Sequence, residues 1–162
     1  MNEATRCPWC GTDKLYVDYH DREWGVPSKD DRHLFEFLVL ESAQAGLSWI
    51  TILRKRENYR RAYDQFDAEK IARYDQHKID TLMQDAGIVR NRLKIEASIN
   101  NAREFLKIRE EFGSFAQYFW QFSDGRPIVN QVATMARIPA TTALSDRIAK
   151  DMKKRGFRFF GS

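Results

Sequence analysis

The stretch from Leu34 to Leu53 constrains the fold most, because a single carboxylate interrupts an otherwise apolar helical stripe. The stripe repeats at positions i, i+3, i+4, i+7 and i+11, which lie on one face of a helix. Its members are Leu34, Phe37, Leu38, Glu41 and Ala45. An ionised carboxylate on such a face loses hydration, so Glu41 must find partners or stay protonated. Two ordinary alternatives stay open: an arginine pairs with Glu41, or the helix is wide and leaves Glu41 at the surface.

A tight corner is expected directly after this helix. Gly46 is typical of a residue that ends a helix, and Ser48 can cap a new helix that begins at Trp49. Such a corner would bring Trp49 near Glu41. A carboxylate acceptor beside a large indole is suited to holding a flat, electron-poor ring that forms hydrogen bonds.

The composition limits the class of protein. The length of 162 residues favours one domain over 1–162, and 43% hydrophobic residues suffice for a core. The sequence contains no apolar run of about 18 residues, and its polar start lacks a secretion signal. Two cysteines are too few for a disulfide framework. We therefore expect a cytoplasmic protein, in the cytosol or nucleoid, that does not bind membranes.

The net charge of +4 is compatible with binding a polyanion but is weak support by itself. The basic residues gather in two groups, of which a solvated surface is the ordinary explanation. The groups are Arg54, Lys55, Arg56, Arg60 and Arg61, and Lys153, Lys154, Arg155 and Arg158.

An all-α fold is expected, because the sequence has neither alternating strand patterns nor a hairpin signal. Periodicity and capping residues predict helices over about 29–44, 48–63, 67–73, 78–84, 91–112, 114–122 and 146–155. Ser28 is expected to open the first helix, and Ser145 to cap the last one. The stretch 123–142 has no amphipathic pattern, and a loop of this length is usually functional or mobile.

The segment 1–29 is interpreted as a structured loop, since it combines many aromatic residues with turn residues and no long helical period. Three of its residues are candidate zinc ligands, although a structural site normally takes four. A fourth ligand could be His33, His77 or a residue beyond this chain, and reduced thiols with a hydrogen-bonded histidine are the alternative. The candidates are Cys7, Cys10 and His20.

The stretch from Gly156 to Ser162 places three aromatic residues between two glycines. A glycine-bounded hairpin after a helix normally leads into another helix that covers such residues. Either the rings pack back onto the chain, or the sequence is truncated after Ser162. We expect truncation of the helical body 30–162 at this end.

Five sequence runs resemble the 3-methyladenine DNA glycosylase I family. They are Tyr19–Gly25, Gln44–Ile50, Lys55–Tyr59, Asp85–Arg90 and Lys153–Phe157. The resemblance extends from about Cys7 to Gly161. It implies an all-α fold of the helix-hairpin-helix glycosylase superfamily, whose second hairpin helix would begin just past Gly161. It also implies hydrolysis of the N-glycosidic bond of 3-methyladenine in double-stranded alkylated DNA, by a monomer that releases the free base.

The resemblance also assigns residues to roles. Glu41 is the catalytic carboxylate that contacts the base, and Trp49 stacks on the base. Aromatic walls are assigned to Trp9, Tyr16, Tyr19 and Trp24. Cys7 and His20 match half of a structural zinc site, and two further ligands are expected beyond the end of this chain. Cys10 is not a ligand in the family pattern, which argues against the Cys-x-x-Cys site.

The chemistry of the lesion fits these assignments. Methylation at N3 makes adenine cationic, so its glycosidic bond is weak, and the flipped-out base needs recognition more than acid catalysis. No lysine is placed as a Schiff-base nucleophile, which predicts a monofunctional enzyme without lyase activity. Two rival functions remain: a non-catalytic DNA- or lesion-binding protein, and a small zinc-stabilised scaffold.

Overall fold

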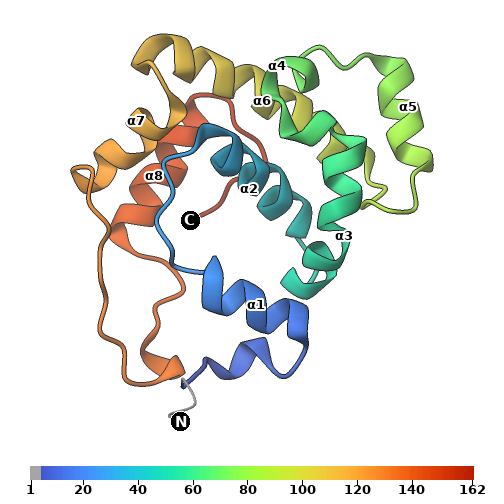
Figure 1. Ribbon diagram of the computed structural model, residues 1–162. Coiled ribbons are helices and arrows are strands. Elements are labelled where there is room, and N and C mark those ends of the chain that lie inside the picture. Colours follow the sequence, from blue (N-terminus) through green and yellow to red (C-terminus); the bar gives the residue numbers. More distant parts are fainter. Residues whose placement is uncertain (1–4) are drawn as a thin grey trace.

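The computed structural model describes residues 5–162, and every regular element in that part of the chain is helical, which confirms the all-α prediction (Figure 1). The α-helices are α1 Lys14–Arg22, α2 Asp31–Gln44, α3 Trp49–Ala62, α4 Ala68–Ile71, α5 Gln76–Gln84, α6 Arg92–Phe112, α7 Phe115–Trp120 and α8 Ala143–Lys154. Four 3-10 turns accompany them: η1 Pro8–Cys10, η2 Asp64–Phe66, η3 Gln121–Ser123 and η4 Met135–Arg137. None of the described helices has the length and apolar character needed to cross a bilayer.

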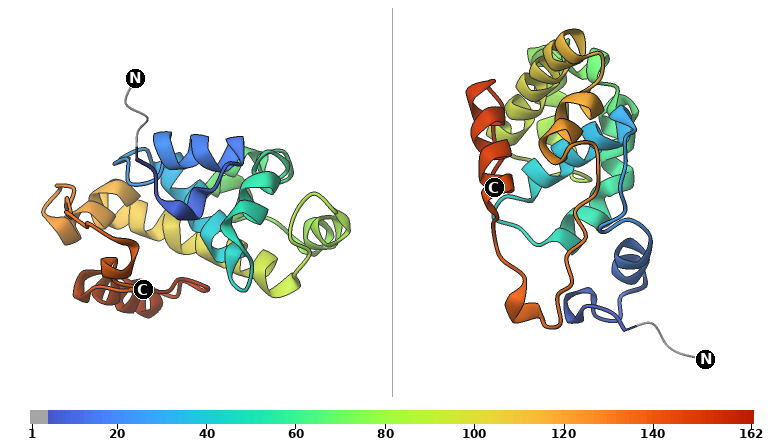
Figure 2. Two further views of the ribbon diagram at one scale, coloured as in Figure 1. Left: turned by 90° about the horizontal axis from the view of Figure 1, so that it is seen from below. Right: turned by 90° about the vertical axis from the view of Figure 1, so that its left-hand side faces the viewer.

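The core forms where α2 packs against α3, α6 and α7. Phe35 of α2 lies 5.0 Å from the ring of Phe105 in α6, which in turn stacks at 4.8 Å on Phe115 of α7. All three rings are buried, and burial of one such side chain stabilises the fold by about 1.5–3 kcal/mol. In the view from below, α1 and α8 lie on opposite sides of this central layer (Figure 2). Helix α2 is therefore positioned firmly from the core side.

The N-terminal segment contains a helix that the sequence analysis missed. Asp13 accepts hydrogen bonds from the backbone amides of Leu15, at 2.9 Å, and Tyr16, at 3.4 Å, and so caps α1. The interpretation of 1–29 as a loop is therefore wrong at residues 14–22, while residues 1–4 lie outside the described part. The helix was missed because it is short and its aromatic side chains pack against other aromatic rings, which hides the usual apolar stripe.

Two helix starts also differ from the prediction. Asp30, and not Ser28, caps α2, because its carboxylate accepts a hydrogen bond from the amide of His33 at 2.7 Å. Helix α8 begins at Ala143, earlier than predicted, because Thr142 and Ser145 form a reciprocal capping box. Ser145 therefore occupies the third helical position of α8 and does not precede the helix.

The corner between α2 and α3 matches the expectation in outline. Gly46 follows the end of α2 with a φ of 77°, a left-handed conformation that glycine adopts at low cost. Ser48 precedes α3, but its hydroxyl hydrogen bonds to the Thr51 hydroxyl at 2.7 Å and does not cap an amide. From the opposite side, the Lys94 ammonium of α6 donates to the carbonyls of Ala43, at 2.9 Å, and Ala45, at 2.5 Å. Helix α6 thus fixes the corner.

Candidate active site

A cavity of about 570 Å³ lies along the outer face of α2. Its walls come from three parts of the chain: α2, α7 and the segment that follows α8. The lining is mostly apolar and includes Leu34, Phe37, Leu38, Glu41, Phe115, Phe119, Phe159 and Phe160. A volume of this size with few polar groups is typical of a site for a small organic ligand.

Glu41 supplies the carboxylate of this cavity. Within the described residues it makes no hydrogen bond or ion pair, so the alternative of an arginine partner is wrong. Its side chain is exposed, as the alternative of a surface position expected, and it lines the cavity. Desolvation by the surrounding groups raises the pKa of Glu41 above its ordinary value of 4.5. The carboxylate is thus free to accept hydrogen bonds from a ligand.

Trp49 lies next to this cavity without lining it. Its ring is 6.0 Å from that of Phe37 and 5.5 Å from that of Tyr19. Phe37 lines the cavity together with Glu41, so Trp49 packs on a residue of the cavity wall. The indole Nε1 is buried and has no hydrogen-bond partner among the described residues. Such an atom is a donor without an acceptor.

The four other predicted aromatic residues form one cluster around Trp9. The Trp9 ring lies 5.1 Å from Tyr16, 6.4 Å from Tyr19 and 5.1 Å from Trp24. Tyr19 connects this cluster to Phe37, at 6.5 Å, and to Trp49. A second hollow, of about 270 Å³, lies between the cluster and α2 and shares Phe37 with the larger cavity.

The hydroxyl of Tyr19 is sensitive to the charges around it. Burial, and next to it the negative charge of Glu41, raise the pKa of Tyr19 to about 12. Tyr19 therefore stays protonated at neutral pH and keeps a hydrogen to donate. The effect of Glu41 on this hydroxyl means that the two groups lie close enough for their charges to interact.

The candidate zinc ligands are only partly brought together. The amide of Cys7 donates to His20 Nε2 at 3.3 Å, and His20 Nδ1 lies 2.9 Å from the carboxylate of Asp21. Cys10 is buried, and its thiol points to the carbonyl of Cys7 at 3.1 Å. Over residues 5–162 the structure contains no group of three or more ligating side chains arranged for a metal ion. His33 packs on Phe37 at 4.8 Å instead.

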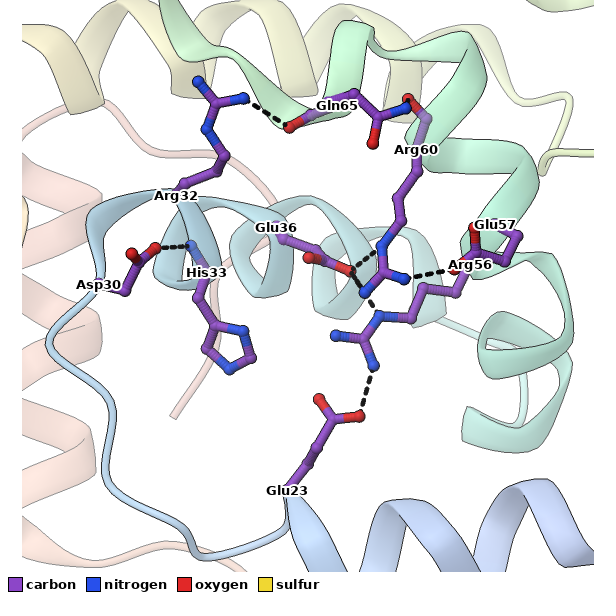
Figure 3. Close-up of polar contacts among 9 residues, drawn as sticks. All are labelled: Glu23, Asp30, Arg32, His33, Glu36, Arg56, Glu57, Arg60 and Gln65. Atoms are coloured by element: carbon purple, nitrogen blue, oxygen red, sulfur yellow. Dashed lines mark hydrogen bonds and ion pairs between the residues drawn. The ribbon is translucent and has the colours of Figure 1, made fainter.

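The sequence analysis missed a buried charge network on the side of α2 that faces α3 (Figure 3). Glu36 is 7% exposed and accepts hydrogen bonds from Arg56, at 2.5 Å, and Arg60, at 3.1 Å. Arg56 also donates to Glu23 at 2.7 Å and lies 5.3 Å from the ring centre of Phe37. The spacing of the two arginines, one helical turn apart, could have indicated a shared carboxylate partner.

This network changes the interpretation of the first basic group. Arg56 and Arg60 pair internally, Arg54 pairs with Asp13, and Lys55 donates to the carbonyl of Ala86. Three of the five members of that group are therefore ion-paired, and Arg61 is exposed without an ion pair among the described residues. In the second group, Arg155 pairs with Glu111 and Asp151. Three members of that group remain exposed: Lys153, Lys154 and Arg158.

The segment after α8 packs back onto the chain. Phe157 belongs to the buried core, and Phe160 packs against that core. Phe159 and Phe160 also line the cavity. Asn101 of α6 anchors this segment, because its amide donates to the carbonyl of Arg158 at 2.9 Å and accepts from the amide of Arg158 at 2.9 Å. The contribution of these rings to the cavity was not predicted from the sequence.

Comparison with known proteins gives a consistent result. A family model described as methyladenine glycosylase matches residues 9–162. The chain is 48% identical to DNA-3-methyladenine glycosylase 1 of Escherichia coli strain K12, over 97% of this chain and 84% of the relative. It is 47% identical to DNA-3-methyladenine glycosylase of Haemophilus influenzae strain KW20, over 98% of this chain and 85% of the relative.

Solved structures agree with these relatives. A crystal structure of a 3-methyladenine DNA glycosylase I has a TM-score of 0.93 at 50% identity, and the match covers 97% of this chain and 86% of that one. A 3-methyladenine DNA glycosylase I in complex with 3-methyladenine has a TM-score of 0.93 at 38% identity, with 98% and 85% covered. The likeness therefore extends over almost the whole chain.

Proposed function

Because this chain belongs to the methyladenine glycosylase family, we propose that it is a DNA-3-methyladenine glycosylase, which hydrolyses the N-glycosidic bond of 3-methyladenine in alkylated double-stranded DNA. The relatives bear this name, and one similar structure is a complex with 3-methyladenine. The observation that carries the proposal is the unpaired carboxylate of Glu41 in a cavity with aromatic walls.

Recognition is the main task of this site. The target base must leave the duplex, at a cost of a few kcal/mol, before it can enter a cavity. 3-Methyladenine is cationic in DNA and leaves as a neutral base, so an anionic, aromatic site favours the lesion over unmodified adenine. We assign Glu41 the role of accepting hydrogen bonds from the base and stabilising positive charge in the transition state.

The aromatic residues are assigned to base binding. Electron-rich ring faces attract a cationic ring by about 0.5–2 kcal/mol each. Phe37 is part of the cavity wall, and Tyr19 and Trp49 contact Phe37 directly. Trp9, Tyr16 and Trp24 support Tyr19 from the other side of the cluster. The buried indole N–H of Trp49 is available to an acceptor on a ligand.

We propose a monofunctional reaction without strand cleavage. A lyase needs a free amine that attacks the sugar. The Lys94 ammonium is committed to the carbonyls of Ala43 and Ala45, and Lys29 donates to the carbonyl of Gly125 while lying 5.1 Å from the Trp120 ring. Both ammonium groups are thus engaged in contacts within the protein.

DNA contact is proposed around the C-terminal end of α8. Lys153, Lys154 and Arg158 are exposed there and can neutralise phosphates. Gly156 ends α8 with a φ of 97°, which fits the first turn of a helix-hairpin-helix element. The anchor formed by Asn101 connects this turn to the cavity wall.

We propose that Cys7 and His20 supply two of the four ligands that a structural zinc site normally takes. Their 3.3 Å backbone-to-ring contact makes them neighbours, and Asp21 orients the imidazole as carboxylates do behind metal-bound histidines. Zinc measured in the purified protein should disappear in Cys7→Ser and His20→Ala and persist in Cys10→Ser. Metal that survives Cys7→Ser, or a protein that binds none, would contradict this assignment.

The experiment that tests the function is incubation with alkylated duplex DNA, followed by analysis of the released base and of the DNA backbone. Free 3-methyladenine with an intact strand is expected, and Glu41→Ala should lower the release while the helical signal in circular dichroism stays unchanged. A stable complex without release would favour the non-catalytic DNA-binding protein. If the protein neither binds the DNA nor releases a base, the scaffold is the explanation that is left. Cleaved strands would disprove the monofunctional reaction.

A further inference from the structure

We propose that Arg56 is a positioning residue for base binding, which fastens the aromatic cluster of α1 to the face of α2 that bears Phe37 and Glu41. The inference rests on the proposed function, since it concerns the cavity in which the base is held. Figure 3 shows the arrangement: the Arg56 side chain extends from α3 and places its guanidinium between Glu36 and Glu23.

The position of Arg56 makes it a junction of three elements. Its side chain is 11% exposed and donates to Glu36 of α2 and to Glu23, which follows α1. Its guanidinium carbon lies 5.3 Å from the ring centre of Phe37, a residue of the cavity wall. Only a planar, forked donor satisfies two carboxylates in different directions while covering a ring face.

The two carboxylates differ in how much they depend on Arg56. Glu36 also receives hydrogen bonds from Arg60, so one arginine remains if Arg56 changes. Glu23 has Arg56 as the partner of its side chain within the described residues. The Arg56–Glu23 contact is therefore a link between the α2–α3 pair and the C-terminal end of α1, and removing it leaves the ion pair of Glu36 with Arg60 in place.

The link acts directly on the aromatic cluster. The backbone amides of Glu23 and Trp24 both donate to the carbonyl of Tyr19, at 2.9 and 3.0 Å. Fixing the Glu23 side chain therefore fixes the last turn of α1 and with it the Tyr19 ring, which stacks on Phe37. The distance between Tyr19 and the wall that bears Glu41 is thus set from α3.

The network also leaves the charge of Glu41 uncompensated. A lone arginine beside Phe37 would repel a cationic base, but Glu23, Glu36 and Glu57 together more than offset the charges of Arg56 and Arg60. Glu41, which has no ion-pair partner among the residues described, therefore keeps its negative charge for a ligand in the cavity. Arg56 can cover the ring of Phe37 without weakening the attraction for a cation.

A purely stabilising role is the rival explanation, and a matched ion pair separates the two. Arg54, also on α3, binds Asp13 at the other end of α1 at 2.8 Å, is 62% exposed and contacts no aromatic ring among the described residues. Arg54→Ala therefore cuts a second link between the same two helices, away from the rings. It serves as the control for Glu23→Ala and Arg56→Lys.

The test measures the affinity for free 3-methyladenine by quenching of tryptophan fluorescence, well below each variant's melting temperature, together with kcat and KM on alkylated DNA. Glu23→Ala and Arg56→Lys should each raise the dissociation constant of the base about tenfold, a loss of about 1.4 kcal/mol in binding, because the Tyr19 ring is no longer held against Phe37. Arg54→Ala should change it by less than about twofold, as exposed pairs contribute little. Glu23→Gln, which keeps an acceptor for Arg56, should restore most of the affinity.

Unchanged affinity in Glu23→Ala, or a loss no larger than that in Arg54→Ala, would overturn the role of Arg56 while leaving the enzyme's function intact. If Arg56→Lys does not fold, the Glu23 variants alone decide the matter, because the Glu23 side chain is partly exposed. A wild-type protein that neither binds 3-methyladenine nor excises it would instead refute the proposed function, and this inference with it.

Discussion

Glu36 and Glu41 belong to the same helix but to two very different regions. Glu36 faces α3, is 7% exposed, and accepts hydrogen bonds from two arginines. Glu41 faces the cavity and has no partner among the residues described, and desolvation raises its pKa. A buried carboxylate with charged partners holds elements together, whereas one left unpaired in a cavity is available to a ligand. The comparison separates an acid that holds helices together from the acid that we propose contacts the base.

The largest expected effect concerns stability at Glu36. Glu36→Ala leaves Arg56 and Arg60 without their shared acceptor in a buried place, and removing one partner of such a pair costs about 3–5 kcal/mol. Urea denaturation should show this loss in the free energy of unfolding. Glu41→Ala is the matched variant on the same helix and should cost far less, because Glu41 has no ion pair to lose. Equal losses of unfolding free energy in Glu36→Ala and Glu41→Ala would contradict the distinction between the two glutamates.

The next effect concerns activity at Glu41. Glu41→Gln keeps the shape of the side chain but removes its charge, and we expect a fall in kcat/KM for excision of about 100-fold, as for loss of one electrostatic contact to a transition state. Glu110→Gln on α6 changes an exposed glutamate outside the cavity and should retain full activity. Single-turnover release of the base from alkylated DNA measures both. Wild-type rates in Glu41→Gln would show that this carboxylate has no part in the reaction.

The smallest effect is a pH dependence at Glu41. The pKa of Glu41 in the folded protein is raised above the ordinary 4.5, so ionisation of Glu41 opposes folding. This loss of stability is complete at a pH above the folded-state pKa. It disappears as the pH falls through the folded-state pKa towards 4.5. Glu41→Gln should therefore melt slightly higher than the wild type at pH 7, by less than about 4 °C, and not at pH 4. Excision by the wild type should decline over the same acidic range. A variant that melts lower at pH 7 would indicate an undetected partner of Glu41.

The difference between the two glutamates also shows what sequence reasoning could reach. The helical stripe identified Glu41 because its neighbours along the chain are apolar, and Gly46 marked the corner that brings Trp49 close. Glu36 lies outside that stripe, and its burial depends on arginines from another helix. Local periodicity contains no information on such a pairing.

Other parts of the site depend on contacts between distant segments. Phe159 and Phe160 reach the cavity because Asn101 holds the backbone of the segment that precedes them, and no local pattern indicates that anchor. Helix α1 was missed because its aromatic side chains pack on Trp9, which lies outside the helix. The all-α class and most helix positions followed from local signals. The cavity walls required the tertiary structure.

The hydrogen bonds of Lys94 to the corner between α2 and α3 have a consequence for redesigning this protein. Its ammonium joins the carbonyls of Ala43 and Ala45, so the spacing between the acid and the indole is dictated from α6. Replacing the residues that line the cavity with smaller ones, to admit bulkier alkylated purines, would not change that spacing. Engineering for a broader substrate range should begin at position 94, outside the cavity, where a shorter side chain would free the corner between α2 and α3.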